Sequence, residues 1–487
     1  MLEILAIVPL ITALLCFLSR SRRLMEITTV LGSGALLVVA AWFAYRVYGN
    51  GPIYEGSLFM DAFSAYILML VCIVGFIAAV YSVGYIGHEY EAKEYGLARL
   101  RYYYSLFHIF IFTMVLVSVS NNLGIMWIAI EATTLASAFL VAFYNKDTSL
   151  EAAWKYIIIC SVGITLALLG IILAYASSVH VLGESSTGLD WSTLMAAAKS
   201  LDPTLVRVAF IMVLVGYGTK VGLAPMHTWL PDAHSQAPTP ISALLSGVLL
   251  NCAMYGVLRF HMISSEALGP GFSGTLLLLF GVLSLLVAAA FIILAKDYKR
   301  LLAYSSIEHM GIISIGFGLG GYFGIFGGLL HMLNHALTKS MLFFSTGNIL
   351  LKFKSKLMED VRGLGKVMPI TAIVFFAGAL AITGSPPFSV FLSEITILYA
   401  GVSQGQFLVV GLLLLFLTII FGAMIYHVGR MVFGEPSPGV QKGEVTRTGV
   451  VVLLVLFAAI LTTGLIIPDF LANLLNQITA LFPGGGS

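Results

Sequence analysis

Hydrophobic residues gather in fourteen long runs, separated by short polar connections. Crossing the hydrocarbon core of a bilayer takes about 20 residues as a helix, and most runs have about that length. Continuous apolar runs do not suit membrane strands, whose side chains alternate between lipid and lumen. The pattern therefore predicts an all-α polytopic membrane protein with about 14 transmembrane helices. The runs are approximately 2–18, 27–45, 62–86, 104–119, 122–144, 154–178, 205–224, 240–263, 274–295, 301–319, 322–350, 368–400, 407–429 and 449–467.

The composition excludes a soluble enzyme. Hydrophobic residues make up 59% of the 487 residues and charged residues only 10%, against about 25% charged in soluble domains. The connections are too short to hold a large extramembrane domain. The four cysteines stand alone in apolar runs, which predicts no zinc site, iron-sulfur cluster or disulfide framework. We therefore expect no cofactor, metal or catalytic redox site in this chain. The cysteines are Cys16, Cys72, Cys160 and Cys252.

Lysine and arginine are distributed unevenly over the connections. Numbered from the first, the odd connections carry 19 of the 25 basic residues and the even ones carry four. The remaining two, Lys220 and Lys339, lie inside runs. An excess of positive charge marks the cytoplasmic side of a membrane protein. We therefore expect both termini on the extracytoplasmic side, in agreement with an even number of spans.

Glycine and proline interrupt two of the runs. The seventh ends in GYGTKVGLAPMHTWLPDAHSQAPTP (216–240), and the twelfth contains ITGSPPFSVFLSE (382–394). Broken helices at corresponding places of two halves indicate an inverted-repeat transporter with its site near the membrane midplane, although a proline kink can also serve packing alone. We expect two inverted five-helix repeats with broken helices 7 and 12. The expected segments are 1–103 (three helices), 104–263 (first repeat), 274–432 (second repeat) and 433–487 (last helix and tail).

Several ionisable residues lie inside the runs. Each costs roughly 2.5–3.5 kcal/mol at the centre of a span, so such residues are functional candidates. Three of them in the eleventh run are spaced by four residues, which places them on one helix face over about 12 Å. This spacing predicts a polar track. The candidates for ion translocation are Glu131, Lys220, Glu308, His309, His331, His335, Lys339 and Glu394.

Structural roles compete with these functional ones. His331 and His335 have the spacing of a two-histidine metal site, but no third ligand is suggested. Glu131 and Lys220 can form a static buried ion pair. Glu308 can pair with a basic residue of the preceding connection, Lys296 or Arg300, at the membrane face. The isolated His108 and His427 near run ends favour structural roles.

Five long strings make the chain recognisable. It resembles the antiporter-like proton-pumping subunits of respiratory complex I and of Mrp-type sodium/proton antiporters over nearly its whole length. Within that superfamily it looks most like the F subunit of hydrogenase-4 and formate hydrogenlyase complexes, a type of energy-converting membrane hydrogenase. The strings are SNNLGIMWIAIEATTLASAFLVAFYN (120–145), SLEAAWKYIIICSVG (149–163), GTKVGLAPMHTWLPDAHSQAPTPISALLSGVLLNCAMYGVLR (218–259), KRLLAYSSIEHMGI (299–312) and HMLNHALTKSMLFFSTGNIL (331–350).

The resemblance implies roles for individual residues. Glu131 matches an acidic residue that pairs with the lysine of the seventh helix, here Lys220. His335 and Lys339 match a central relay on a broken eleventh helix, and Glu394 matches the exit residue of the twelfth. The chain departs from several relatives at Asn251, where they carry lysine or histidine. Asn251 therefore removes or replaces a titratable bridge, and by this reading Glu308 supplies another charge near His309.

The resemblance also implies partners and a setting. It predicts a proton-translocating subunit, with sodium/proton exchange as a variant, driven by electron transfer in a redox complex of a prokaryotic plasma membrane. Its partners would be other antiporter-like and small membrane subunits, a membrane anchor subunit and a peripheral redox arm, with no nucleic acid. Iron-sulfur clusters and a nickel-iron centre would lie in those partners. Two other functions stay open: a membrane anchor that does not pump, and a stand-alone secondary transporter.

Overall fold

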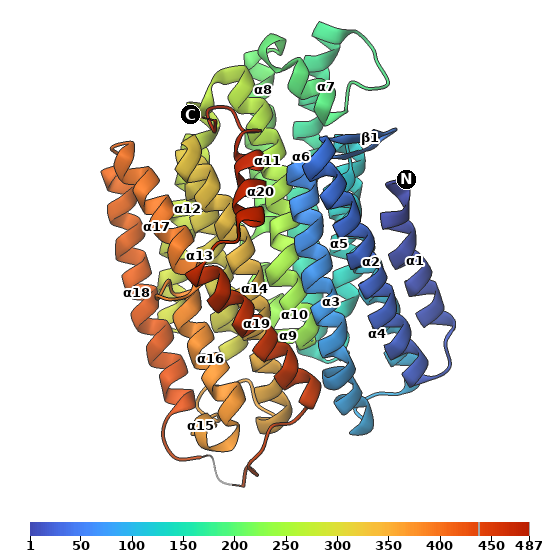
Figure 1. Cartoon of the computed structure of the whole chain (residues 1–487), viewed down its shortest axis with the longest axis vertical. Coiled ribbons are helices and arrows are strands. Elements are labelled where there is room, and N and C mark those ends of the chain that lie inside the picture. The colour runs from blue at the N-terminus through green and yellow to red at the C-terminus, as the bar shows by residue number, and fades with distance from the viewer. Residues whose placement is uncertain (437–438, 487) are drawn as a thin grey trace.

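The computed structural model describes residues 1–436 and 439–486, which form a bundle of helices (Figure 1). Both termini lie at the upper end of the bundle in that view. The first half comprises α1 (Glu3–Leu18), α2 (Arg22–Asn50), β1 (Ile53–Glu55), β2 (Leu58–Met60), α3 (Ala62–Glu91), α4 (Leu97–Val119), α5 (Leu123–Val141), α6 (Asp147–Leu182), α7 (Trp191–Ala196), α8 (Pro203–Val221), α9 (Trp229–Gln236), α10 (Thr239–Leu244), a π-helical segment (Leu245–Leu249) and α11 (Leu250–Leu268). The second half comprises α12 (Pro270–Ile293), α13 (Tyr298–Leu319), α14 (Gly321–Phe353), α15 (Leu364–Val367), α16 (Pro369–Ile382), α17 (Ser389–Ser403), α18 (Phe407–Val432), α19 (Arg447–Leu465) and α20 (Asp469–Thr479).

Each of the fourteen hydrophobic runs coincides with a helix or with consecutive helices, which confirms the all-α prediction. Among the described residues, ten helices are long and apolar enough to cross a membrane, and Thr239–Leu268 is counted as one of them. Three shorter apolar helices, α1, α16 and α17, add to this set. The number of crossings stays a prediction, because α13 and α14 are long enough to cross a membrane but carry more polar residues than these helices.

Small residues let neighbouring helices approach closely. A Cβ atom added to Gly281 on α12 would lie 2.7 Å from the backbone oxygen of Gly311 on α13. On the other side of the bundle, a Cβ at Gly216 on α8 would lie 2.5 Å from the backbone nitrogen of Ala167 on α6. Apolar burial contributes little to helix association within lipid, so close backbone packing of this kind holds the helices together.

Both predicted breaks are present. α8 ends at Val221, where Gly222 has a φ of +83°, and α9 begins only at Trp229. α16 ends at Ile382, Gly384 has a φ of +69°, and α17 begins at Ser389. Left-handed backbone of this kind suits glycine and ends a helix.

The eleventh run differs from what the resemblance implied, because α14 is one continuous helix from Gly321 to Phe353. That run contains no proline, so nothing in it removes a helical hydrogen bond. The expected break in this helix is therefore wrong. The local irregularity lies instead in the eighth run, as the π-helical segment between α10 and α11.

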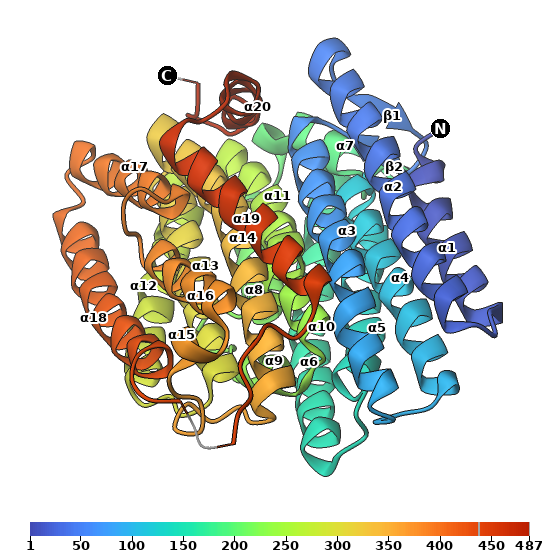
Figure 2. The same ribbon diagram turned by 60° about the horizontal axis from the view of Figure 1, so that its bottom comes forward.

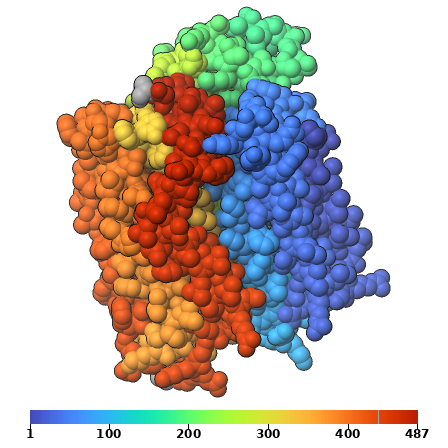
Figure 3. Space-filling model, in the orientation of Figure 1, coloured from blue at the N-terminus to red at the C-terminus, as the bar shows by residue number. Residues whose placement is uncertain are grey.

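Elements from the middle and from the C-terminal part of the chain cover the outside of the bundle. α19 slants across the outside of the bundle and contacts α3, α14 and α17 (Figure 2). The segment around α7, green in Figure 3, caps the upper end of the molecule. These elements cover the bundle, whose interior holds the buried polar side chains discussed below, on α5, α6, α8, α9, α11, α13, α14 and α17.

Two basic residues that we assigned to connections are buried in the structure. Arg259 lies in α11 and is 2% exposed, and its guanidinium donates two hydrogen bonds of 2.7 and 2.8 Å to the Asp61 carboxylate. Lys299, in the first turn of α13, is fully buried. Lys220 and Lys339 are therefore not the only cations inside the protein, because a cation near the end of a run looks like part of a connection in the sequence.

Candidate functional site

The Lys220 side chain lies at the end of α8, just before the first break, and is fully buried. Its Nζ donates a hydrogen bond of 2.8 Å to Thr134 Oγ1 on α5 and another to the Tyr156 hydroxyl on α6. Across the break, Trp229 Nε1 donates to the backbone oxygen of Thr219 at 2.8 Å. The start of α9 thus holds the end of α8 in place, and Lys220 reaches hydroxyl partners on two neighbouring helices.

Glu131 lies on α5, one turn from Thr134, and is half-buried. Its carboxylate accepts a hydrogen bond from Ser161 Oγ at 2.8 Å and a longer one from Thr134 Oγ1 at 3.5 Å. The chain makes no direct ion pair between Glu131 and Lys220 within the described residues. The two groups are instead linked through the Thr134 hydroxyl, which accepts from the lysine and donates to the carboxylate.

A second cluster of titratable side chains lies between α13, α14 and α17. His309 Nδ1 and His331 Nε2 are 2.8 Å apart, and the other ring nitrogen of His331 is 2.9 Å from Ser393 Oγ. The His335 ring packs against His309, with ring centroids 5.3 Å apart, and its Nε2 is 3.1 Å from the backbone oxygen of Ser246. These three histidines are fully buried and form a nearly continuous row.

Lys339 lies on the same face of α14 as His331 and His335, one turn closer to the end of the bundle that carries the basic connections. Its Nζ donates a hydrogen bond of 2.9 Å to the backbone oxygen of Leu302 on α13, and the side chain is fully buried. His331, His335 and Lys339 are thus all directed into the interior, as their four-residue spacing predicted.

Glu308 does not pair with a basic residue at the membrane face. It is fully buried, neither carboxylate oxygen has a hydrogen-bond partner, and Oε2 lies 4.0 Å from His309 Nε2. The pairing with Lys296 or Arg300 is wrong, since Arg300 binds Asp232 at 2.5 Å instead. Glu308 adds a carboxyl group to the histidine cluster.

Glu394 lies on α17, directly beyond the second break, and is 5% exposed. One oxygen of its carboxylate lies where a side chain at Gly384 would point, and the other has no hydrogen-bond partner. One potential ligand atom each from His309, His331 and Glu394 lies within 4.8 Å of the other two. Glu394 on α17 therefore supplies the third potential metal ligand that the sequence did not suggest, and His335 is not part of this group.

Replacing Gly384 by alanine is expected to displace the Glu394 carboxylate. The new Cβ would overlap Glu394 Oε2, and the φ of +69° is unfavourable for any residue with a side chain. We expect proton translocation by the assembled complex to fall by about tenfold, less than the roughly hundredfold cost of losing a proton-transfer group altogether. Gly405→Ala is the matched control, because Gly405 has a similar φ of +70° but nearby only the ring of Phe407. Equal losses in both variants would contradict a specific effect on Glu394.

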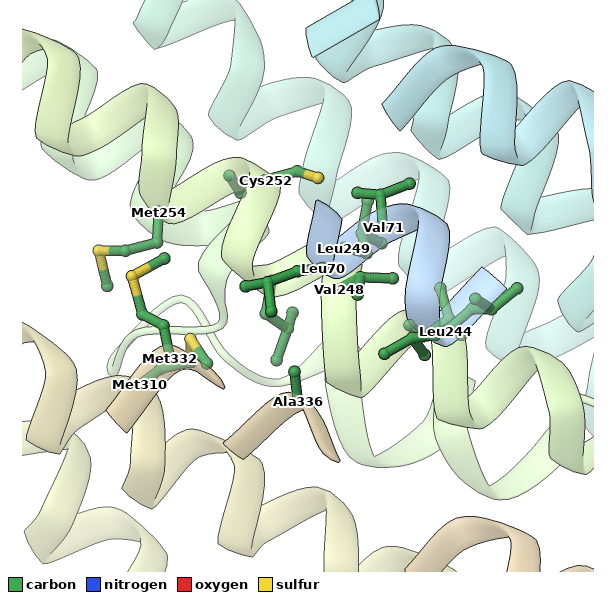
Figure 4. Close-up of a cluster of buried hydrophobic side chains, with 14 of the residues drawn as sticks. Leu70, Val71, Leu244, Val248, Leu249, Cys252, Met254, Met310, Met332 and Ala336 are labelled. Atoms are coloured by element: carbon green, nitrogen blue, oxygen red, sulfur yellow. The ribbon is translucent and has the colours of Figure 1, made fainter. Parts of the chain in front are cut away.

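Asn251 lies on α11 and is buried. Its Nδ2 donates to the backbone oxygens of Gly247 in the π-helical segment, at 2.9 Å, and of Met332 on α14, at 3.3 Å. Figure 4 shows the cluster of apolar side chains at this level, including Met254, Met310 and Met332. The amide therefore ties α11 to α14, and hydrophobic side chains fill much of the space around it.

Sequence reasoning missed the neutral partners of these charges. Thr134, Tyr156, Ser161 and Ser393 carry the hydrogen bonds of both clusters. Hydroxyl groups are common in apolar helices, where they bond to the backbone of the preceding turn, so their presence alone gives no signal. A search for hydroxyl residues one turn from a buried charge would have found Thr134, three residues after Glu131.

The chain matches two protein-family models and several known proteins. Residues 120–421 match the family model described as NADH:quinone oxidoreductase/Mrp antiporter, and residues 54–95 match the N-terminal model of complex I chain 5. The chain is 44% identical to a hydrogenase-4 component F homolog of Methylacidiphilum infernorum, over 78% of this chain and 80% of that protein. It is 33% identical to hydrogenase-4 component B of Escherichia coli, of which it covers 50%.

Solved structures show the same fold. A chain of the membrane-bound sulfane sulfur reductase, an archaeal respiratory membrane complex, superposes with a TM-score of 0.88 at 25% identity, covering 99% of this chain and 97% of the other. A chain of the Mrp complex from Dietzia has a TM-score of 0.85 at 20% identity, covering 98% and 96%. Each of these is a subunit of a membrane complex with several chains.

Proposed function

Because the chain belongs to the NADH:quinone oxidoreductase/Mrp antiporter family of membrane proteins, we propose that it translocates protons when driven by electron transfer in partner subunits. The observation that supports this most is the set of ionisable side chains buried in two clusters, one at each helix break. Such residues are costly within a membrane and mark ion pathways. The groups are the half-buried Glu131 and the buried Lys220 in the first cluster, and the buried Glu308, His309, His331, His335, Lys339 and Glu394 in the second.

The chemistry of the second cluster favours protons over sodium. Three imidazoles and one amine dominate it, and nitrogen bases bind and release protons, whereas hard cations prefer oxygen ligands. The close contact between His309 and His331 allows a proton to pass from one ring to the next. We propose that protons travel along Lys339, His335, His309 and His331 and leave past Glu394.

Glu131 acts as the electrostatic control of Lys220 in this proposal. The hydrogen bonds through Thr134 are 2.8 and 3.5 Å long. At a separation of ~6 Å and an effective dielectric constant of about 20, the two charges attract by roughly 2.8 kcal/mol. Moving one proton against about 150 mV takes roughly 3.5 kcal/mol. A movement that lengthens or shortens this link therefore changes the proton affinity of Lys220 on the scale that a pump requires.

The setting of the chain is part of the same proposal. The bias of basic residues supports a cytoplasmic side at the lower end of Figure 1, where α9 and α15 lie, with both termini on the extracytoplasmic side of a prokaryotic plasma membrane. We propose a redox complex with other antiporter-like and small membrane subunits, an anchor subunit and a peripheral arm that holds iron-sulfur and nickel-iron centres. The two breaks support a division into two inverted repeats, 104–263 and 274–432.

Replacing Glu131 by glutamine tests this function. The variant keeps the hydrogen-bond acceptor for Ser161 but removes the charge that acts on Lys220. We expect redox-driven proton uptake by the purified complex in liposomes to fall about tenfold. Glu151→Gln on α6 is the control, because its carboxylate is exposed and pairs only with Lys155 at the surface.

The result separates the proposed function from its alternatives. Unchanged proton uptake by the complex with Glu131→Gln would mean that uptake does not depend on this chain. It would favour a membrane anchor that does not pump. Ion transport by the purified chain alone in liposomes, without partner subunits, would favour a stand-alone transporter.

A further inference from the structure

His234 is a buried histidine that belongs to neither cluster. It lies on the short helix α9, directly after the first break, and is fully buried. Neither of its ring nitrogens has a hydrogen-bond partner in the protein. Its ring is stacked on Phe343 of α14, with centroids 5.3 Å apart and an interplanar angle of 17°. A histidine that only fills space is usually satisfied by at least one hydrogen bond, so two free nitrogens require an explanation.

The neighbours of His234 are the cations of the second half. Phe343, on which the ring lies, is one helical turn beyond Lys339. His234 lies within electrostatic range of Lys299, Lys339 and His335. Lys299 Nζ donates a hydrogen bond of 2.7 Å to the backbone oxygen of Ala237, at the end of α9. His234 thus lies three residues before the carbonyl that holds Lys299, and its ring stacks on a side chain one helical turn from Lys339.

A cavity of about 380 Å³ leads to Lys299 from the end of the bundle that carries the basic connections. Its lining includes Glu89, Tyr144, Lys146, Lys299, Lys354 and Lys356. Burial lowers the pKa of Lys356, outside the membrane spans, while the nearby Asp297 opposes this shift. Ala237, whose carbonyl binds Lys299, also lines the cavity. The cavity is therefore lined both by Lys299 and by the residue whose carbonyl holds it, three residues after His234.

The second cluster needs a supply of protons that does not pass Asn251. That residue is not titratable, and its Nδ2 is engaged by two backbone oxygens. Its neighbour in the sequence, Cys252, and Met332, whose carbonyl it binds, belong to an apolar cluster (Figure 4). The lining of the cavity that reaches Lys299 does not include Asn251.

We propose that Lys299 and His234 form a second proton inlet, which supplies Lys339 directly from the cytoplasmic side. This inference rests on the proposed function. In each transfer a proton leaves Lys299 Nζ for one nitrogen of His234, and the other nitrogen gives its proton to Lys339 Nζ. Only N–H bonds form and break, and the imidazole returns to its first tautomer by rotation of the ring. The phenyl ring of Phe343, stacked on the imidazole, restricts the orientation of the His234 ring.

Replacing His234 by glutamine tests the inlet in the assembled complex. The variant keeps a polar side chain of similar length but cannot carry a proton. We expect proton uptake per electron transferred to fall by about tenfold or more, since a lost proton-transfer group typically costs roughly a hundredfold or more. His108→Gln is the matched control, since His108 is equally buried on α4, has an unpartnered Nε2 and lies in neither cluster. Wild-type uptake with His234→Gln would overturn the inlet.

A Lys339→Ala variant measured in parallel keeps the two proposals separate. If Lys339→Ala abolishes proton uptake while His234→Gln leaves it unchanged, the inlet is wrong and the proposed function stands. If both variants pump normally, the proposed function itself is wrong. Amounts of complex recovered with all partner subunits show whether each variant folds.

A labelling experiment tests the inlet without changing His234. Thr148 lines the cavity and is exposed, and all four native cysteines are buried. A charged, membrane-impermeant thiosulfonate applied to inside-out vesicles should modify Thr148→Cys and slow proton uptake several-fold. Gln441→Cys is an exposed control in the connection between α18 and α19. Modification of Thr148→Cys without any change in uptake would contradict a cytoplasmic inlet at this cavity.

Discussion

Replacing Lys220 by arginine is expected to abolish proton translocation, although the variant keeps the positive charge at the first helix break. Arginine cannot lose its proton in a protein, whereas a buried lysine can. Lys220 has only hydroxyl partners, Thr134 and Tyr156, and no carboxylate bonds directly to it. A permanent cation would hold the site in its loaded state. We expect the rate of proton uptake to fall by about a hundredfold or more.

The measurement is redox-driven proton uptake by the purified complex in liposomes, normalised to the rate of electron transfer. Lys199→Arg is the matched control, because Lys199 is 80% exposed and pairs with Glu266 in a connection. A second variant, Lys220→Met, removes the charge altogether and should fail equally. If the arginine variant pumped and the methionine variant did not, Lys220 would serve only as a fixed charge, and the switching role proposed for Glu131 would be wrong.

Much of the fold follows from simple patterns in the sequence. Apolar runs of membrane length predicted the helices, and glycine and proline predicted both breaks, because these residues end helices by local geometry alone. The eleventh run shows the limit of reasoning by resemblance. With no proline within it, α14 continues through the position where a break was expected. The π-helical segment beside Asn251 has no local sequence signal, since it depends on how α10 and α11 pack.

The candidate site was predictable to the extent that it consists of charges in apolar runs. Lys220, Lys339 and the histidines stood out because lipid excludes such groups. Lys299 did not, since it lies beside Lys296 and Arg300 in what reads as a basic connection, and only the packing of α13 against α9 buries it. His234 lies in a string rich in proline and histidine. Its two free nitrogens are a property of its three-dimensional surroundings.

The buried Asp61–Arg259 pair carries the largest expected effect on stability. The guanidinium is held by two hydrogen bonds from Arg259 to the carboxylate and one of 3.0 Å to Ser64 Oγ. It also lies 4.1 Å from the ring centroid of Trp191 and 4.8 Å from that of Tyr255. Asp61 in turn caps α3 by accepting from the backbone nitrogen of Ser64. The pair thus joins the start of α3 to α11 and to the segment around α7.

Replacing Asp61 by asparagine is expected to destabilise the protein by roughly 3–5 kcal/mol, because it leaves a buried guanidinium without its counter-charge. Asparagine preserves the cap of α3, so the loss reports the charge and not the helix terminus. Arg259→Met should cost less, since a carboxyl group left alone can bind a proton whereas a guanidinium cannot lose one. Unfolding in mixed detergent micelles, followed by tryptophan fluorescence, shows which of the two variants is less stable. Lys199→Met, which breaks an exposed ion pair, should change stability little.

The double variant of Asp61→Asn and Arg259→Met should be more stable than Asp61→Asn alone, because it removes the unpaired cation. If the two losses instead added, the residues would act independently and the pair would not be the link between α3 and α11.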